Sequence, residues 1–90
     1  MEAYKFEHNE LKINVQHLHV HKKAVLLDIE VNNRYLDVSG ITDENGLPGI
    51  ALSNGSLSTV IVFPAYKTYE VFSTSVHKYR VRVALIEREH

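Results

Sequence analysis

Apolar and polar residues alternate along most of this chain, in short runs that are rich in Val, Ile, Tyr, Phe and Thr. No stretch carries the clean 3.6-residue repeat of an amphipathic helix. A two-residue repeat places alternate side chains on opposite faces of a strand, so the sequence predicts an all-β protein. We expect strands at residues 3–7, 11–20, 24–31, 34–41, 57–63, 66–72 and 76–87.

Residues 42–56 interrupt this pattern, and we expect them to form one long, turn-rich loop. The pairs Asn45-Gly46, Pro48-Gly49 and Asn54-Gly55 favour turns and positive φ. Between them, Ile50-Ala51-Leu52 is apolar enough for a brief strand. The whole chain is therefore expected to form a single compact antiparallel β-domain of about seven strands, either a sandwich or a partly open barrel.

Asn32-Asn33 stands between two β-rich runs, at the spacing of a two-residue hairpin turn. Pairing Val31 with Arg34 aligns the apolar positions of both runs on one face. The same register predicts that Asp28 lies directly opposite Asp37, where two like charges repel each other.

Three histidines alternate with two aliphatic residues in the segment His17–His21. A strand would place the imidazoles on one face and the aliphatic side chains on the other. The residues before this segment alternate in the opposite phase, so a β-bulge near Gln16 is needed to keep both apolar sets in the core. If Lys22-Lys23 form the next turn, His17 lies opposite Asp28.

The candidate metal ligands are His17, His19 and His21, with Asp28 or Asp37 as a third. Strand residues two apart lie about 6.7 Å apart at the backbone, which lets neighbouring imidazoles meet at one ion. Such ligands suit Zn, Ni, Cu or Fe. The same cluster would also respond to pH near the usual histidine pKa of about 6.5. A solvated, partly ion-paired face is the simplest interpretation, so no cofactor is expected.

The composition limits location and chemistry. The chain has 90 residues and no cysteine, which excludes disulfides, thiolate metal sites and a cysteine nucleophile. We expect a cytoplasmic protein, because a chain without cysteine fits a reducing compartment. No apolar run is long enough to span a membrane, and the N-terminus lacks a signal-peptide pattern, so no membrane contact is expected.

A formal net charge of −1 argues against bulk affinity for nucleic acid. The charges are uneven, because residues 28–44 carry five acidic side chains and one basic one, whereas residues 65–82 carry four basic and one acidic. The aromatic residues Tyr66 and Tyr69 would add a stacking platform for single-stranded nucleic acid, which is an alternative function. The candidate patch for an anionic partner consists of Lys67, Lys78, Arg80 and Arg82.

The last predicted strand becomes apolar on both faces near its end. Its odd-numbered residues from Tyr79 to Leu85 share one face, and the opposite face changes from basic to apolar at Ala84 and Ile86. A strand of this kind is usually covered on both sides, as a central strand or at a subunit contact. Ala84 and Ile86 are therefore candidate contacts of a homo-oligomer.

The segment Ser39–Gly49 resembles the turn after the first strand in transthyretin-like and carboxypeptidase-regulatory sandwich domains. Those domains usually continue with a second Asp/Gly-rich turn and an aromatic strand, to which Ser53–Ser56 corresponds only loosely. The resemblance covers about eleven of 90 residues, and turn chemistry alone produces the same string, so the chain is not assigned to that family.

No catalytic signature is present in the sequence. The serines and threonines lack a nucleophile-elbow pattern, there is no Gly-rich phosphate loop, and a carboxylate pair made by Asp28 and Asp37 has little chain from which to build a cleft. We therefore expect a non-enzymatic domain that binds another protein, or a second copy of itself, as an accessory subunit, inhibitor or immunity-like factor does.

Overall fold

The computed structural model describes the backbone of residues 5–6, 13–21, 24–31, 36–54 and 58–88, and the side chains of the last three ranges. The described residues form strands and one short 3-10 helix, η1, which spans Pro64–Tyr66. The strands are β1 (Lys5–Phe6), β2 (Ile13–His21), β3 (Ala24–Val31), β4 (Asp37–Thr42), β5 (Pro48–Ser53), β6 (Ser58–Val62), β7 (Tyr69–His77) and β8 (Arg80–Glu87).

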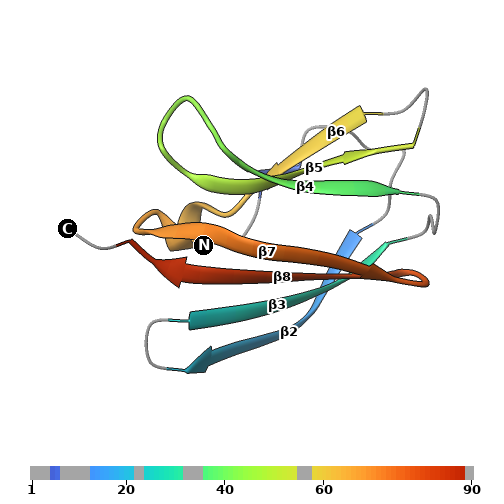
Figure 1. Ribbon diagram of the computed structural model, residues 1–90, viewed down its shortest axis with the longest axis horizontal. Helices are drawn as coiled ribbons and strands as arrows, with labels where there is room; N and C mark the ends of the chain where they lie inside the picture. Colours follow the sequence, from blue (N-terminus) through green and yellow to red (C-terminus); the bar gives the residue numbers. More distant parts are fainter. Residues whose placement is uncertain (1–4, 7–12, 22–23, 32–35, 55–57, 89–90) are drawn as a thin grey trace.

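The strands form two antiparallel sheets that face each other in two layers (Figure 1). One sheet has the order β1-β6-β5-β4, and the other has the order β2-β3-β8-β7. The all-β prediction is confirmed, and the arrangement is a sandwich rather than a closed barrel. Within the described residues, no helix has the length and apolar character needed to span a membrane.

The core lies between the two sheets, and β3 and β8 form its centre on one side. Side chains in these two strands alternate between buried and more exposed positions, as a half-buried strand requires. Burying one such aliphatic side chain contributes about 1.5–3 kcal/mol. The core members from both sheets include Val25, Leu27, Ile29, Val31, Val81, Val83 and Leu85 on one side and Ile50, Leu52 and Ile61 on the other.

The two sheets approach each other along β4 and β7, which lie side by side (Figure 1). The Thr74 hydroxyl donates a hydrogen bond to the Val38 carbonyl at 3.3 Å. Gly40 permits this approach, because a Cβ at that position would lie 2.6 Å from Val71 Cγ1. The two sheets are therefore in contact along this side of the sandwich.

The turn between β4 and β5 is built by Asp43. Its Oδ1 accepts hydrogen bonds from the backbone N–H of Asn45 at 2.9 Å and of Leu47 at 2.7 Å. Gly46 follows with a φ of 79°, which glycine adopts without strain. Arg88 Nη2 donates to the Gly46 carbonyl at 2.6 Å and so connects the end of β8 to this turn.

The prediction of a loop over residues 42–56 is wrong in its middle, because β5 occupies Pro48–Ser53. The apolar triplet that could form a brief strand is the centre of β5, where Ile50 and Leu52 are fully buried. Because the pair Pro48-Gly49 favours turns, the sequence did not indicate a strand that begins there. Proline is tolerated at the first residue of a strand, and β5 begins at Pro48.

The predicted hairpin between residues 24–31 and 34–41 is also wrong. β3 pairs with β2 and β8, whereas β4 pairs with β5 in the other sheet. Asp28 therefore lies opposite Arg82, and Asp37 lies opposite Ser53. The expected turn at Asn32-Asn33 lies outside the described residues. A crossing between sheets buries the same apolar side chains as a hairpin does, so alternation alone does not separate the two.

The β-bulge expected near Gln16 is confirmed. Val15 pairs with Ile29 and His17 pairs with Asp28, so the register shifts between them. The expected alignment of His17 with Asp28 is confirmed by the same pairing. A second shift, which was not predicted, lies between Val71 and Ser73 in β7.

Candidate binding surface

The β7–β8 hairpin forms one end of the candidate site. His77 pairs with Arg80, which leaves Lys78 and Tyr79 as a two-residue turn. Lys78 has a φ of 56°, in the left-handed region that such turns use. The prediction that Lys78 and Tyr79 belong to the strand is therefore wrong, and Tyr79 is 47% exposed instead of buried. The predicted break at 73–75 is wrong as well, because β7 continues through it.

The outer face of the sheet β2-β3-β8-β7 is the face turned away from the other sheet. The strand register arranges it in rows that run across β3, β8 and β7. Two polar rows lie next to the hairpin turn, and two rows with apolar residues follow them directly. From the turn inward, the rows are Glu30–Arg80–His77, Asp28–Arg82–Ser75, Leu26–Ala84–Ser73 and Ala24–Ile86–Glu70.

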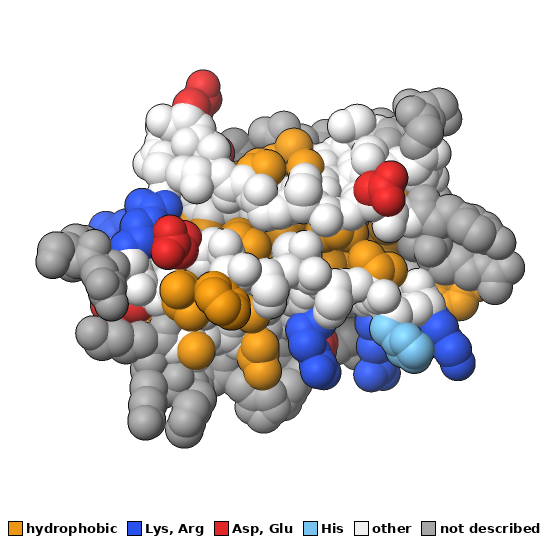
Figure 2. All heavy atoms as spheres, viewed as in Figure 1, with side chains coloured by type: hydrophobic (Ala, Val, Ile, Leu, Met, Phe, Trp, Pro, Cys, Tyr) orange, Lys and Arg blue, Asp and Glu red, His pale blue; other side chains and the backbone are white. Residues whose placement is uncertain are grey.

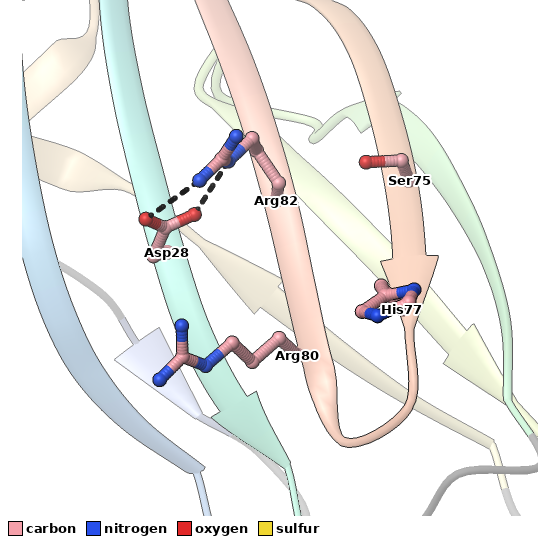
Figure 3. Close-up of a pocket in the computed structure, with 5 residues that line it drawn as sticks. All are labelled: Asp28, Ser75, His77, Arg80 and Arg82. Carbon is pink, nitrogen blue, oxygen red and sulfur yellow. Dashed lines mark hydrogen bonds and ion pairs between the residues drawn. The ribbon is translucent and has the colours of Figure 1, made fainter.

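Asp28 and Arg82 form a two-pronged ion pair at the centre of the polar rows (Figure 3). Arg82 Nε donates to Asp28 Oδ1 at 2.7 Å, and Nη2 donates to Oδ2 at 3.2 Å. This geometry fixes both side chains. The hydrogen bond and the charge of Asp28 raise the pKa of the Arg82 guanidinium above its usual value. Because the Arg82 side chain is 60% exposed, the ion pair contributes little to the stability of the fold. Its main effect is to fix the positions of the Asp28 and Arg82 side chains.

Arg80 lies beside this pair and extends across β3 (Figure 3). A surface depression of about 250 Å³ is lined by Asp28, Ser75, His77, Arg80 and Arg82. A second depression adjoins it and shares His77 and Arg80, with Glu30, Lys78 and Tyr79 as its other lining residues. Arg80 makes no hydrogen bond or ion pair within the described part of the chain. Its guanidinium is therefore available to a ligand.

The charges around the two depressions do not cancel. They comprise three cations, Lys78, Arg80 and Arg82, and two carboxylates, Asp28 and Glu30. The carboxylates have interactions of their own, and Asp28 is held by Arg82. We call His77, Lys78, Arg80 and Arg82 the cationic end of the outer face. Figure 2 shows basic side chains and a histidine gathered along one side of the molecule.

An apolar patch adjoins the cationic end. Leu26 is 39% exposed in β3, and Phe72 is 70% exposed at the β7 register shift. Ala84 and Ile86, the predicted oligomer contacts, lie next to them on the outer face and are half-buried. Figure 2 shows the exposed hydrophobic side chains beside the basic ones. We call Leu26, Phe72, Ala84 and Ile86 the outer apolar patch.

Two parts of the predicted anionic-partner patch lie elsewhere. Lys67 follows η1, at the end of β7 opposite the hairpin turn, so it does not join the cationic end. Tyr66 is buried and packs edge-on against Tyr69, with ring centroids 5.7 Å apart. Burial raises the pKa of the Tyr66 hydroxyl. The expected stacking platform is therefore wrong, because these rings belong to the core and its rim.

The predicted metal ligands are only partly brought together. The backbone register places His17 opposite Asp28, His19 opposite Leu26 and His21 opposite Ala24. Their side chains lie outside the described part of the chain. Asp37 is in the other sheet, and Asp28 is bound by Arg82. Within the described residues, no group of three or more candidate ligands is close enough to hold a metal ion.

The sequence reasoning missed Leu26, Phe72, Ser75 and His77 as surface residues. Leu26 stands where the alternation of its strand places exposed residues, so the periodicity could have predicted its exposure. Phe72 carries no such signal, because a bulge decides its exposure. Ser75 and His77 could be assigned to the site only once the register of the β7–β8 hairpin was known.

Comparison with protein-family models, with curated proteins and with solved structures finds no match for this chain.

Proposed function

We propose that this protein is a non-enzymatic binding domain that docks another protein on the outer face of the β2-β3-β8-β7 sheet. One observation carries the proposal. Among the described residues, the large hydrophobic side chains that are most exposed are Leu26, Phe72, Val76 and Tyr79. Leu26 and Phe72 lie on this face and Tyr79 lies in its hairpin turn, whereas Val76 pairs with the buried Val81 and belongs to the inner side of the sheet edge. An apolar surface of this kind, bordered by polar residues, is typical of protein interaction sites.

The composition of the face supports a protein as the ligand. Interfaces favour aromatic side chains and arginine, with the apolar residues at the centre and charged residues at the rim. Here Phe72 and Leu26 adjoin Arg80 and Arg82 within two rows of the sheet. The depressions beside them are open surface features, which suit a protein better than a small enclosed substrate.

The test is a quantitative capture experiment with three tagged proteins: the wild type, Phe72→Asp and the matched control Ser39→Asp. Phe72 and Ser39 are both exposed strand residues, but Ser39 belongs to the other sheet. We expect a stoichiometric partner from extracts of the producing cells to bind the wild type and Ser39→Asp and to be lost with Phe72→Asp. The proposal is contradicted if Phe72→Asp keeps that partner, or if no stoichiometric partner binds and the wild type is also monomeric.

A second copy of the chain is one form that the partner can take. Sedimentation velocity of the purified wild type and of Phe72→Asp separates monomer from dimer and so tests for this case. A wild-type dimer that Phe72→Asp converts to monomer assigns the outer apolar patch to self-association, with Ala84 and Ile86 in the contact. A monomer in both samples leaves a different protein as the partner.

A further inference from the structure

We infer that the partner presents a short extended segment in which a carboxylate side chain stands four residues from an apolar one, with the carboxylate bound by Arg80. This inference rests on the proposed function and names the chemistry of its ligand. The cationic end and the outer apolar patch serve as two subsites on the same face.

The cationic end offers one guanidinium that is not bound by another described residue. Arg82 donates two hydrogen bonds to Asp28, at 2.7 and 3.2 Å. Arg80 makes no hydrogen bond or ion pair within the described residues, and it lines both depressions. A planar guanidinium with free N–H groups binds a carboxylate through two parallel hydrogen bonds. Arg80 is thus the residue that recognises the anion.

The strand register sets the spacing between the two subsites. Arg80 and Ala84 are four residues apart on β8 and so stand about 13 Å apart at the backbone. The row of the Asp28–Arg82 ion pair lies between the row of Arg80 and the apolar row that contains Leu26 and Ala84. A bound segment in the extended conformation has the same two-residue repeat. Its acidic side chain then meets Arg80 when the side chain four residues along the segment meets Leu26 and Phe72.

The charge pattern favours an acidic protein segment over a nucleic acid. The three cations and two carboxylates around the depressions leave a net charge of +1 with His77 neutral, and the whole chain has a net charge of −1. The phosphodiester backbone of a nucleic acid is normally held by many cations along a groove, and its bases stack on aromatic rings. The rings of Tyr66 and Tyr69 are not available for such stacking, because they pack against each other.

The test is a fluorescence-anisotropy titration with a labelled peptide, Gly-Ser-Glu-Glu-Ser-Ser-Phe-Gly. A matched peptide carries glutamine in place of both glutamates. We expect the acidic peptide to bind the wild type about tenfold more tightly than the glutamine peptide, because one charge-assisted pair carries the difference. Arg80→Gln should lose most of this preference. Lys67→Gln, a change of a lysine outside the cationic end, should keep it.

Equal binding of the two peptides, or an equal loss in Lys67→Gln, overturns the inference. Tighter binding of a single-stranded oligothymidine of the same length also overturns it and assigns the cationic end to nucleic acid. Thermal unfolding of each variant verifies that it is folded. The two proposals fail separately, because a captured partner that depends on Phe72 but not on Arg80 contradicts only the acidic segment.

Discussion

Thr59 shows how much a single buried polar group matters in this core. It lies in β6, it is 4% exposed, and its hydroxyl has no hydrogen-bond partner within the described part of the chain. Removing a hydroxyl from water without a new partner costs free energy, and the protein carries that cost in its folded state. A threonine in a strand otherwise fits well, because its β-branched shape suits the pleated surface.

We therefore predict that Thr59→Val raises the free energy of unfolding by about 1 kcal/mol, since valine keeps the shape and removes the unpaired hydroxyl. Urea unfolding of the wild type and the variant measures this change. Thr59→Ser is the control, because it keeps the hydroxyl, removes the methyl group and should lower the stability. A destabilising effect of Thr59→Val would mean that the hydroxyl has a stabilising partner.

At the scale of elements, the contact between β4 and β7 decides how closely the two sheets approach. A Cβ at Gly40 would lie 2.6 Å from Val71 Cγ1 and 2.8 Å from Val71 Cβ. Valine has few rotamers with which to avoid this overlap, and its Cβ moves only with the backbone. Gly40 is thus required by its neighbour across the sheet boundary and not by its own φ.

Gly40→Ala is expected to lower the free energy of unfolding by about 1–3 kcal/mol, as overpacking usually does. The same substitution in a Val71→Ala background should cost much less, because the methyl groups that cause the overlap are absent. A double-mutant cycle from urea unfolding gives the coupling between the two positions. An equal cost in both backgrounds would show that Val71 is not the obstacle.

Local alternation predicted most of the strands, since it depends only on which side chains are apolar. It predicted the bulge near Gln16 for the same reason, because two apolar sets of opposite phase cannot share a face without one. It did not assign strands to sheets. The run after Asn33 pairs with β5 in the other sheet, and both arrangements bury the same residues.

At the scale of the whole molecule, the surface depends on register more than on composition. Arg80 and Arg82 were predicted as part of an anionic-partner patch, and they lie together on the outer face. Lys67 was predicted with them and lies at the other end of β7. The pairing of Asp28 with Arg82 could not be predicted from the sequence, because it depends on a contact between residues 54 positions apart.

The same dependence explains the apolar patch. Leu26, Ala84 and Phe72 come from three different strands, and only the sheet order β3-β8-β7 makes them neighbours. The result is a face with an apolar area and a cationic area side by side. We expect this face, and not the outer face of the other sheet, to meet the partner.

Hydroxyl-radical footprinting of the protein, alone and in complex with its captured partner, shows which face the partner covers. The method reads the solvent exposure of individual side chains, and Phe72 in the outer apolar patch and Ile41 in β4 give one reporter for each sheet. We expect the oxidation of Phe72 and Leu26 to fall in the complex while that of Ile41 is unchanged. Protection of Ile41 with unchanged oxidation of Phe72 would contradict this expectation.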